Sequence, residues 1–169
     1  MPADILAAAD DARIAALETR LSRLEAERDI LATFARYGHS IDYGREADWV
    51  DCFAPDAVYD VILPGEAPDA PPGIRSVGTA ELAQFAAAHS RAPDRWHKHL
   101  VVNPVFAFDA DLAGADVESY FLRVDAMPPH RVIYAQGRYK DRMRLCPDGR
   151  WRFARRRCEV EAMEPPSSA

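Results

Sequence analysis

The chain has 169 residues, of which 49% are apolar and 28% charged, values typical of a folded globular domain rather than a disordered one. Its formal net charge of -6 and its pI near 5.3 argue against nucleic acid as a main partner. The three cysteines (Cys52, Cys146 and Cys158) are odd in number and lack C-x-x-C spacing, so neither a disulfide framework nor a zinc site is expected.

The N-terminus lacks a basic n-region, and no apolar run approaches the roughly 20 residues of a membrane span. A cytoplasmic protein that does not bind a membrane is therefore expected.

A long helix, or two abutting helices, is predicted over residues 10–41, which contain no proline and one glycine, Gly38. Apolar residues recur at helical spacings of three and four, at Ile14, Leu17, Leu21, Leu24, Leu31 and Ala35. The first turns of this helix extend further than is needed to close one domain. We expect residues 1–24 to be a helical extension, residues 25–162 the domain, and residues 163–169 a flexible tail.

The extension favours a homo-oligomer, either a dimer or a trimer, because an exposed heptad-like stripe commonly finds a partner. Arg28 interrupts this stripe. The alternative is a helix that folds back on its own sheet.

The next elements are shorter. A helix is predicted at residues 47–53, ending before Pro55, and a β-branched alternating strand at residues 55–63. Residues 64–73 are proline-rich and predict a loop. Thr79 is expected to cap a helix that ends near His89.

The rest of the chain predicts four strands, at residues 99–108, 116–125, 132–145 and 151–160, joined by short turns. Short connections predict an antiparallel meander, and helices followed by a sheet predict an α+β fold with the helices on one face. Arg138, Lys140, Arg142 and Arg144 share one face of the third strand, which is expected to contact solvent or another subunit.

Polar residues occupy buried positions in this pattern. At about 100° per residue, Tyr37 and Asp42 fall inside the apolar arc of the first helix. A buried carboxylate costs several kcal/mol unless it is paired. His97 and His99 share one face of a strand, so they could meet Asp42. The alternative is that Asp42 caps a turn or pairs with an arginine.

Five motifs occur in order between about residues 25 and 160: Y-x-x-x-x-D, F-x-x-D-A, H-x-x-x-N, G-x-Y-x-D and D-G-x-W-R. They begin at Tyr37, Phe53, His99, Gly137 and Asp148. In this order they resemble the SnoaL-like group of the nuclear transport factor 2 (NTF2-like, cystatin-like) superfamily. The resemblance implies a cone-shaped α+β barrel, in which a curved antiparallel sheet packs around N-terminal helices and an apolar cavity opens at one end.

Members to which the chain is similar include scytalone dehydratase and bile-acid 7α-dehydratase, where an Asp–His pair is the base. The resemblance implies that Asp42 and His99 form this pair, that Tyr37 acts as the electrophile, and that no cofactor or metal takes part. Leu145 stands where a related dehydrochlorinase has an arginine, so halide elimination is not expected.

The expected function is that of a dehydratase or isomerase acting on a hydrophobic, cyclic or polycyclic ketone or alcohol. Candidate substrate contacts are His97, Tyr59, Asn103 and Arg156. A supporting role remains open for His97, a strand-end role for Asn103, and a solvated position for Arg156.

Two alternatives remain. One is a binding or assembly module, since fold does not fix function. The other is an iron site built from two histidines and one aspartate, which the resemblance disfavours.

Overall fold

The computed structural model describes residues 3–67, 71–127 and 130–164, with the backbone alone at residues 3–9 and 127. The predicted long helix is one continuous helix, α1 (Ala3–Asp42). It is followed by α2 (Glu46–Val50), β1 (Phe53–Ile62), β2 (Ile74–Val77) and α3 (Gly78–Ala88). The four long strands are β3 (His97–Phe108), β4 (Gly114–Met127), β5 (His130–Leu145) and β6 (Trp151–Met163).

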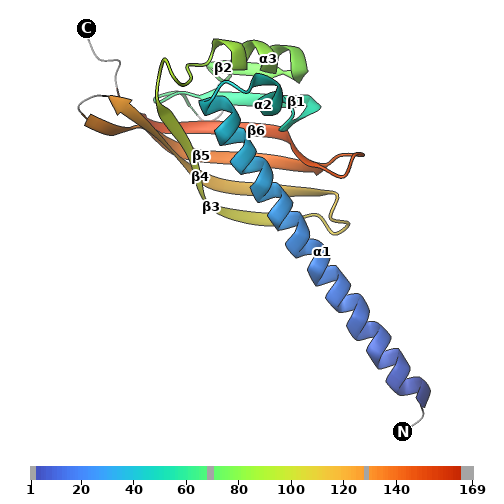
Figure 1. Ribbon diagram of the computed structural model, residues 1–169. Coiled ribbons are helices and arrows are strands. Elements are labelled where there is room, and N and C mark those ends of the chain that lie inside the picture. Colours follow the sequence, from blue (N-terminus) through green and yellow to red (C-terminus); the bar gives the residue numbers. More distant parts are fainter. Residues whose placement is uncertain (1–2, 68–70, 128–129, 165–169) are drawn as a thin grey trace.

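The six strands form one sheet in the order β2-β1-β6-β5-β4-β3. All neighbours are antiparallel except β1 and β6, which are parallel. The sheet curves around the helices and stays open, with β2 and β3 as its edges (Figure 1). The α+β prediction is therefore confirmed.

Three local predictions need correction. The second helix ends at Val50, and Phe53 already begins β1. Strand β2 was not predicted. Thr79 is not the helix cap, because α3 begins at Gly78 and the Glu81 carboxylate accepts the Val77 backbone N–H at 2.7 Å. Residues 165–169 of the expected tail lie outside the described residues.

Aromatic rings fill the space between the helices and the inner face of the sheet. Phe34 of α1 stacks on Phe153 of β6 with ring centroids 5.4 Å apart, and Trp49 of α2 lies 4.7 Å from Phe53. These side chains are at most 4% exposed. Their burial fixes α1 and α2 on the sheet, because each large ring removes much apolar surface from water.

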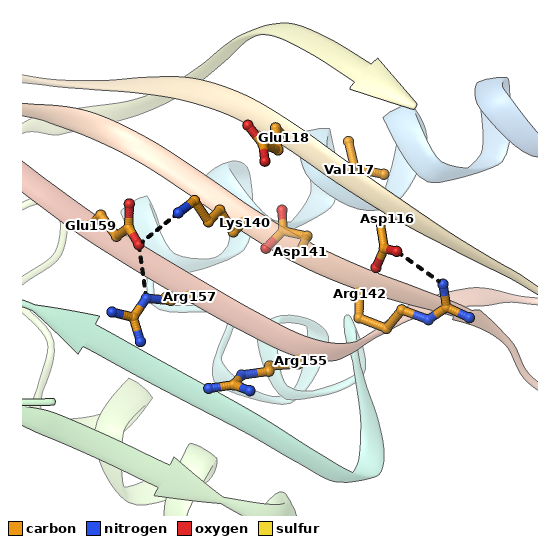
Figure 2. A pocket seen from close by; sticks show the side chains of 9 residues that line it. All are labelled: Asp116, Val117, Glu118, Lys140, Asp141, Arg142, Arg155, Arg157 and Glu159. Carbon is orange, nitrogen blue, oxygen red and sulfur yellow. Dashed lines mark hydrogen bonds and ion pairs between the residues drawn. The ribbon is translucent and has the colours of Figure 1, made fainter. Parts of the chain in front are cut away.

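The outer face of the sheet is charged. Figure 2 shows Lys140 and Arg157 directed at Glu159, and Arg142 at Asp116. The corresponding N–O distances are 3.2, 2.9 and 3.5 Å. This is the face on which Arg138, Lys140, Arg142 and Arg144 were predicted to lie. It is open to solvent in the single chain. The exposed Arg142–Asp116 pair contributes little to stability.

The N-terminal half of α1 projects away from the sheet (Figure 1). Its apolar side chains from Ile14 to Leu24 are 52–62% exposed. Across the part of the chain that is described, no helix is both long and apolar enough to cross a bilayer.

Candidate active site

Asp42, the last residue of α1, reaches His99 on β3. Its Oδ1 lies 2.6 Å from His99 Nδ1, and its Oδ2 accepts the His99 backbone N–H at 3.1 Å. Gly38, one helical turn earlier, makes this approach possible. A Cβ there would lie 2.9 Å from the His99 backbone oxygen, so any larger residue would push the helix from the strand. The one glycine predicted inside the helix therefore positions Asp42.

The electrostatics of Asp42 favour its charged form. The carboxylate is only 3% exposed, and burial alone would raise its pKa. The hydrogen bonds and charge of His99 outweigh burial, and the pKa is lowered. A carboxylate at Nδ1 fixes the imidazole tautomer with the proton on Nδ1, which leaves Nε2 as an acceptor.

Two further histidines surround the pair. His97 Nε2 is 3.5 Å from Asp42 Oδ1, and the His89 ring centroid lies 5.4 Å from those of His97 and His99. Burial, with Arg123 and His99 nearby, lowers the pKa of His97 to about 4. Burial and the neighbouring His99 lower that of His89 to about 3. Both rings are therefore neutral at pH 7.

Among the described residues, these three histidines are the ones that come closest to a metal-binding set. One nitrogen from each of His89, His97 and His99 lies within 4.8 Å of the others. Bonds of about 2.0–2.1 Å would place the ligands of a tetrahedral zinc roughly 3.3 Å apart. Because Asp42 already holds Nδ1 of His99, the rings would have to draw together around Nε2 to bind a metal.

A cavity of about 230 Å³ opens beside this cluster. Its polar lining comes from His89, His99, Arg123, Cys158 and four tyrosines, Tyr37, Tyr59, Tyr134 and Tyr139. Its apolar walls include Ile41, Val61, Phe85, Phe121 and Val160. A mostly apolar pocket with a few convergent polar groups is the usual form of a small-molecule site.

The phenols meet at one wall of the cavity. The hydroxyls of Tyr37 and Tyr59 are 3.3 Å apart. Burial raises the pKa of Tyr37 although the nearby Arg156 opposes the rise, and burial raises that of Tyr59 well above its usual value. Both are therefore neutral O–H donors at pH 7.

This combination of fold and cavity agrees with a family match. Residues 22–157 match the model of the SnoaL-like domain. The chain belongs to the SnoaL-like family. None of the curated proteins compared with it matches.

Solved structures share the fold of this SnoaL-like chain at low sequence identity. A protein of unknown function from Mycobacterium tuberculosis is 24% identical, with 87% of this chain and 76% of that chain covered, and a TM-score of 0.69. An NTF2-like protein with a cystatin-like fold from Novosphingobium aromaticivorans is 20% identical, with 85% and 87% covered and a TM-score of 0.72. The beta subunit of a proposed aromatic-ring-hydroxylating dioxygenase from the same organism is 22% identical, with 86% and 95% covered and a TM-score of 0.72. These likenesses show the fold alone.

The SnoaL-like domain does not bring every predicted site residue to the cavity. Arg156 points inward but is fully buried beneath aromatic rings, with its guanidinium carbon 3.5 Å from the Tyr139 centroid and 4.1 Å from that of Tyr37. The rings separate it from the cavity, so the expectation of direct substrate contact was wrong. Arg156 instead acts on the phenols through its charge.

Asn103 also requires correction. It lines a groove on the outer face of the sheet with Tyr120 and Arg138, not the cavity. Simple alternation would place it on the face of His99. However, the β3–β4 register shifts between Val102 and Val105, and Asn103 has φ +54°, which breaks the alternation. His97, in contrast, lies against Asp42 behind the cavity lining, where it supports the pair.

Several cavity residues of the SnoaL-like domain were not predicted, among them His89 and Arg123. His89 was regarded only as the end of a helix, and its position depends on how α3 packs. Arg123 lies directly across from His99 in the β3–β4 register, and the carboxylate of Asp125 holds it with contacts of 2.8 and 3.0 Å. Alternation along residues 116–125 assigns Arg123 to one face of the sheet. Only the strand register shows that it lies opposite His99.

Proposed function

We propose that this protein is a cofactor-independent lyase or isomerase that removes a proton from a carbon next to a carbonyl group. The observation that carries the proposal is the 2.6 Å contact between Asp42 Oδ1 and His99 Nδ1 at the wall of an apolar cavity. An Asp–His pair outside such a cavity would be a structural contact only.

His99 is the proposed base. With its Nδ1–H donated to Asp42, its Nε2 lone pair takes the proton from the α-carbon, and the C–H electrons form an enolate. Asp42 then stabilises the imidazolium, as a buried carboxylate does in other His-dependent sites. His89 and His97 stay neutral, so they do not compete for this proton.

Tyr37 is the proposed electrophile. Its neutral hydroxyl can donate a hydrogen bond to the carbonyl oxygen as negative charge develops there. If the β-carbon bears a hydroxyl group, the enolate expels it, the His99 imidazolium supplies the proton, and water and an enone result. If it does not, reprotonation at another carbon gives an isomer.

The size of the cavity narrows the substrate class. Ligand pockets commonly measure about 300–1,000 Å³, and this cavity of about 230 Å³ falls below that range. Its volume and its aromatic walls favour a substrate with one or two rings over a polycyclic one. Arg123, at the cavity wall, can bind an additional oxygen of the substrate.

The test is a panel of cyclic β-hydroxyketones and cyclic β,γ-unsaturated ketones with one to four rings, followed by ultraviolet absorbance of the enone product. We expect turnover of at least one compound with one or two rings, and a much lower kcat in His99→Ala with little change in binding. Equal turnover by wild type and His99→Ala would refute the proposed base.

A second candidate is a ligand-binding or assembly module, which the similarity to an oxygenase beta subunit favours. Tight binding of hydrophobic ketones without turnover of any panel member would support this candidate.

A further inference from the structure

An exposed apolar stripe runs along the first part of α1, and the domain leaves it uncovered. It consists of Ile14, Leu17, Leu21, Leu24 and Leu31, which are 43–62% exposed. Their spacings of three and four follow a heptad repeat, with Arg28 at the one interrupted position.

The domain cannot cover this stripe by folding the helix back. Helix α1 is continuous to Asp42, and its buried residues face the sheet, as Ile30, Phe34 and Tyr37 do. At about 100° per residue, the centre of the stripe lies about 150° around the helix from the centre of that buried arc. Residues 14–24 of the stripe therefore point away from the chain's own core, whereas Leu31 lines a groove between α1 and β3.

The residues beside the stripe indicate what covers it. With Ile14 and Leu21 at a positions and Leu17 and Leu24 at d positions, the g positions before residue 27 are arginines and the e positions are glutamates. They are Arg13, Arg20, Glu18 and Glu25. In a parallel pair, each g residue meets the e residue five positions later in the other helix, which brings Arg13 to Glu18 and Arg20 to Glu25. An antiparallel pair would set glutamate against glutamate and, in most registers, arginine against arginine.

We propose that residues 14–31 pair with the same residues of a second copy of this chain in a parallel, two-stranded coiled coil. Ile14 at a and leucine at d suit two strands. Arg28 at an a position can extend its charged end past the seam into water. Because the N-terminal half of α1 projects beyond the sheet (Figure 1), the two domains do not occupy the seam over that half.

The first experiment measures mass by light scattering on the full chain. We expect about twice 18.8 kDa for the wild type at tens of micromolar. Leu17→Glu/Leu24→Glu should raise the dimer dissociation constant at least about 100-fold, because two apolar seam positions become charged. The control, Ala16→Glu/Ser22→Glu, adds the same charge off the stripe and should remain a dimer. All four positions are exposed, so neither variant disturbs the core.

The second experiment exchanges charges. Arg13→Glu/Arg20→Glu places only glutamates beside the central seam, and Glu18→Arg/Glu25→Arg only arginines. Each alone should dimerise more weakly than the wild type, and an equimolar mixture should form a heterodimer, because the g and e pairs become opposite in charge again.

The third experiment determines orientation. Asp10 occupies the next d position, so Asp10→Cys should form a disulfide-linked dimer on mild oxidation if the helices are parallel. Ala12→Cys, on the opposite face, should not. The native cysteines are buried and do not compete. A monomeric or trimeric wild type, a dimer that survives Leu17→Glu/Leu24→Glu, or no Asp10→Cys crosslink in a dimer would overturn the proposal.

Discussion

Two carboxylates, Asp42 and Asp141, lie inside this domain at 3% and 4% exposure, yet they differ in charge behaviour. Asp42 accepts two hydrogen bonds from His99, and its pKa is lowered. Asp141 accepts no hydrogen bond from the described part of the chain, and its nearest cation, Arg156 Nε, is 3.6 Å away. Burial, only partly offset by Arg156, raises its pKa to about 7.

The comparison shows that hydrogen-bond donors, not burial, decide whether an inner carboxylate stays charged. Asp42 has donors because α1 approaches β3 closely at Gly38. Asp141 has none because the aromatic rings around Arg156 leave its guanidinium without a hydrogen-bond partner among the described residues. The first arrangement can support proton transfer at the cavity, and the second contributes to the core.

The largest expected effect comes from Asp42→Asn. Loss of the carboxylate removes the partner of Nδ1, and turnover of a panel substrate should fall about 10²–10⁴-fold. A readout that needs no substrate is the ¹⁵N spectrum of His99. In the wild type it should show the proton on Nδ1 of the neutral ring, and in Asp42→Asn a changed tautomer balance. Asp56→Asn, an exposed aspartate, is the control, and an identical His99 spectrum in Asp42→Asn would contradict the assignment.

The Arg156–Asp141 pair should have the next largest effect. Arg156→Met leaves Asp141 buried without a counter-charge and should lower the free energy of unfolding by about 3 kcal/mol at pH 7. Arg156→Met/Asp141→Leu, which removes both charges, should recover most of this loss. Urea unfolding followed by circular dichroism measures both. If the double variant is no more stable than the single one, the cost lies in lost packing instead.

The pH dependence of the free energy of unfolding should distinguish His97 from Asp141. Between pH 4 and 6.5 the folded state keeps His97 neutral, while the unfolded state protonates it, so stability rises with pH. Asp141 acts in the opposite direction, because the folded state holds a proton up to about pH 7 that the unfolded state has lost. Each slope is at most about 1.4 kcal/mol per pH unit.

Unfolding free energies measured at pH 5 and pH 6.5 check this opposition. His97→Gln should make the rise with pH shallower, and Asp141→Asn should make it steeper. The same slope in both variants and the wild type would show that neither group titrates as described.

The smallest effect should come from an exposed pair on the outer face. Arg144 contacts Asp56, and the side chains are 42% and 72% exposed. Arg144→Ala should change the free energy of unfolding by less than about 1 kcal/mol, and added salt should reduce the change further. A larger loss would indicate that this face does more than contact solvent.

The local sequence determined much of this protein. The three-four spacing of α1, the alternation of the last four strands, and the positions of Tyr37 and Asp42 on the buried arc are periodic properties. A short window of residues is enough to fix them. The proline-rich segment at residues 64–73 likewise predicted a break between elements.

Tertiary structure alone decided the neighbours of these residues. Alternation assigns a face but neither register nor depth, so it could not place Arg123 across from His99, or Arg156 beneath the rings of Tyr37 and Tyr139. It also failed at Asn103, where a positive φ breaks the pattern. His89 joined the site only because α3, which packs on β1 and α2, ends beside His97 and His99. These features depend on contacts between distant segments, which no local period encodes.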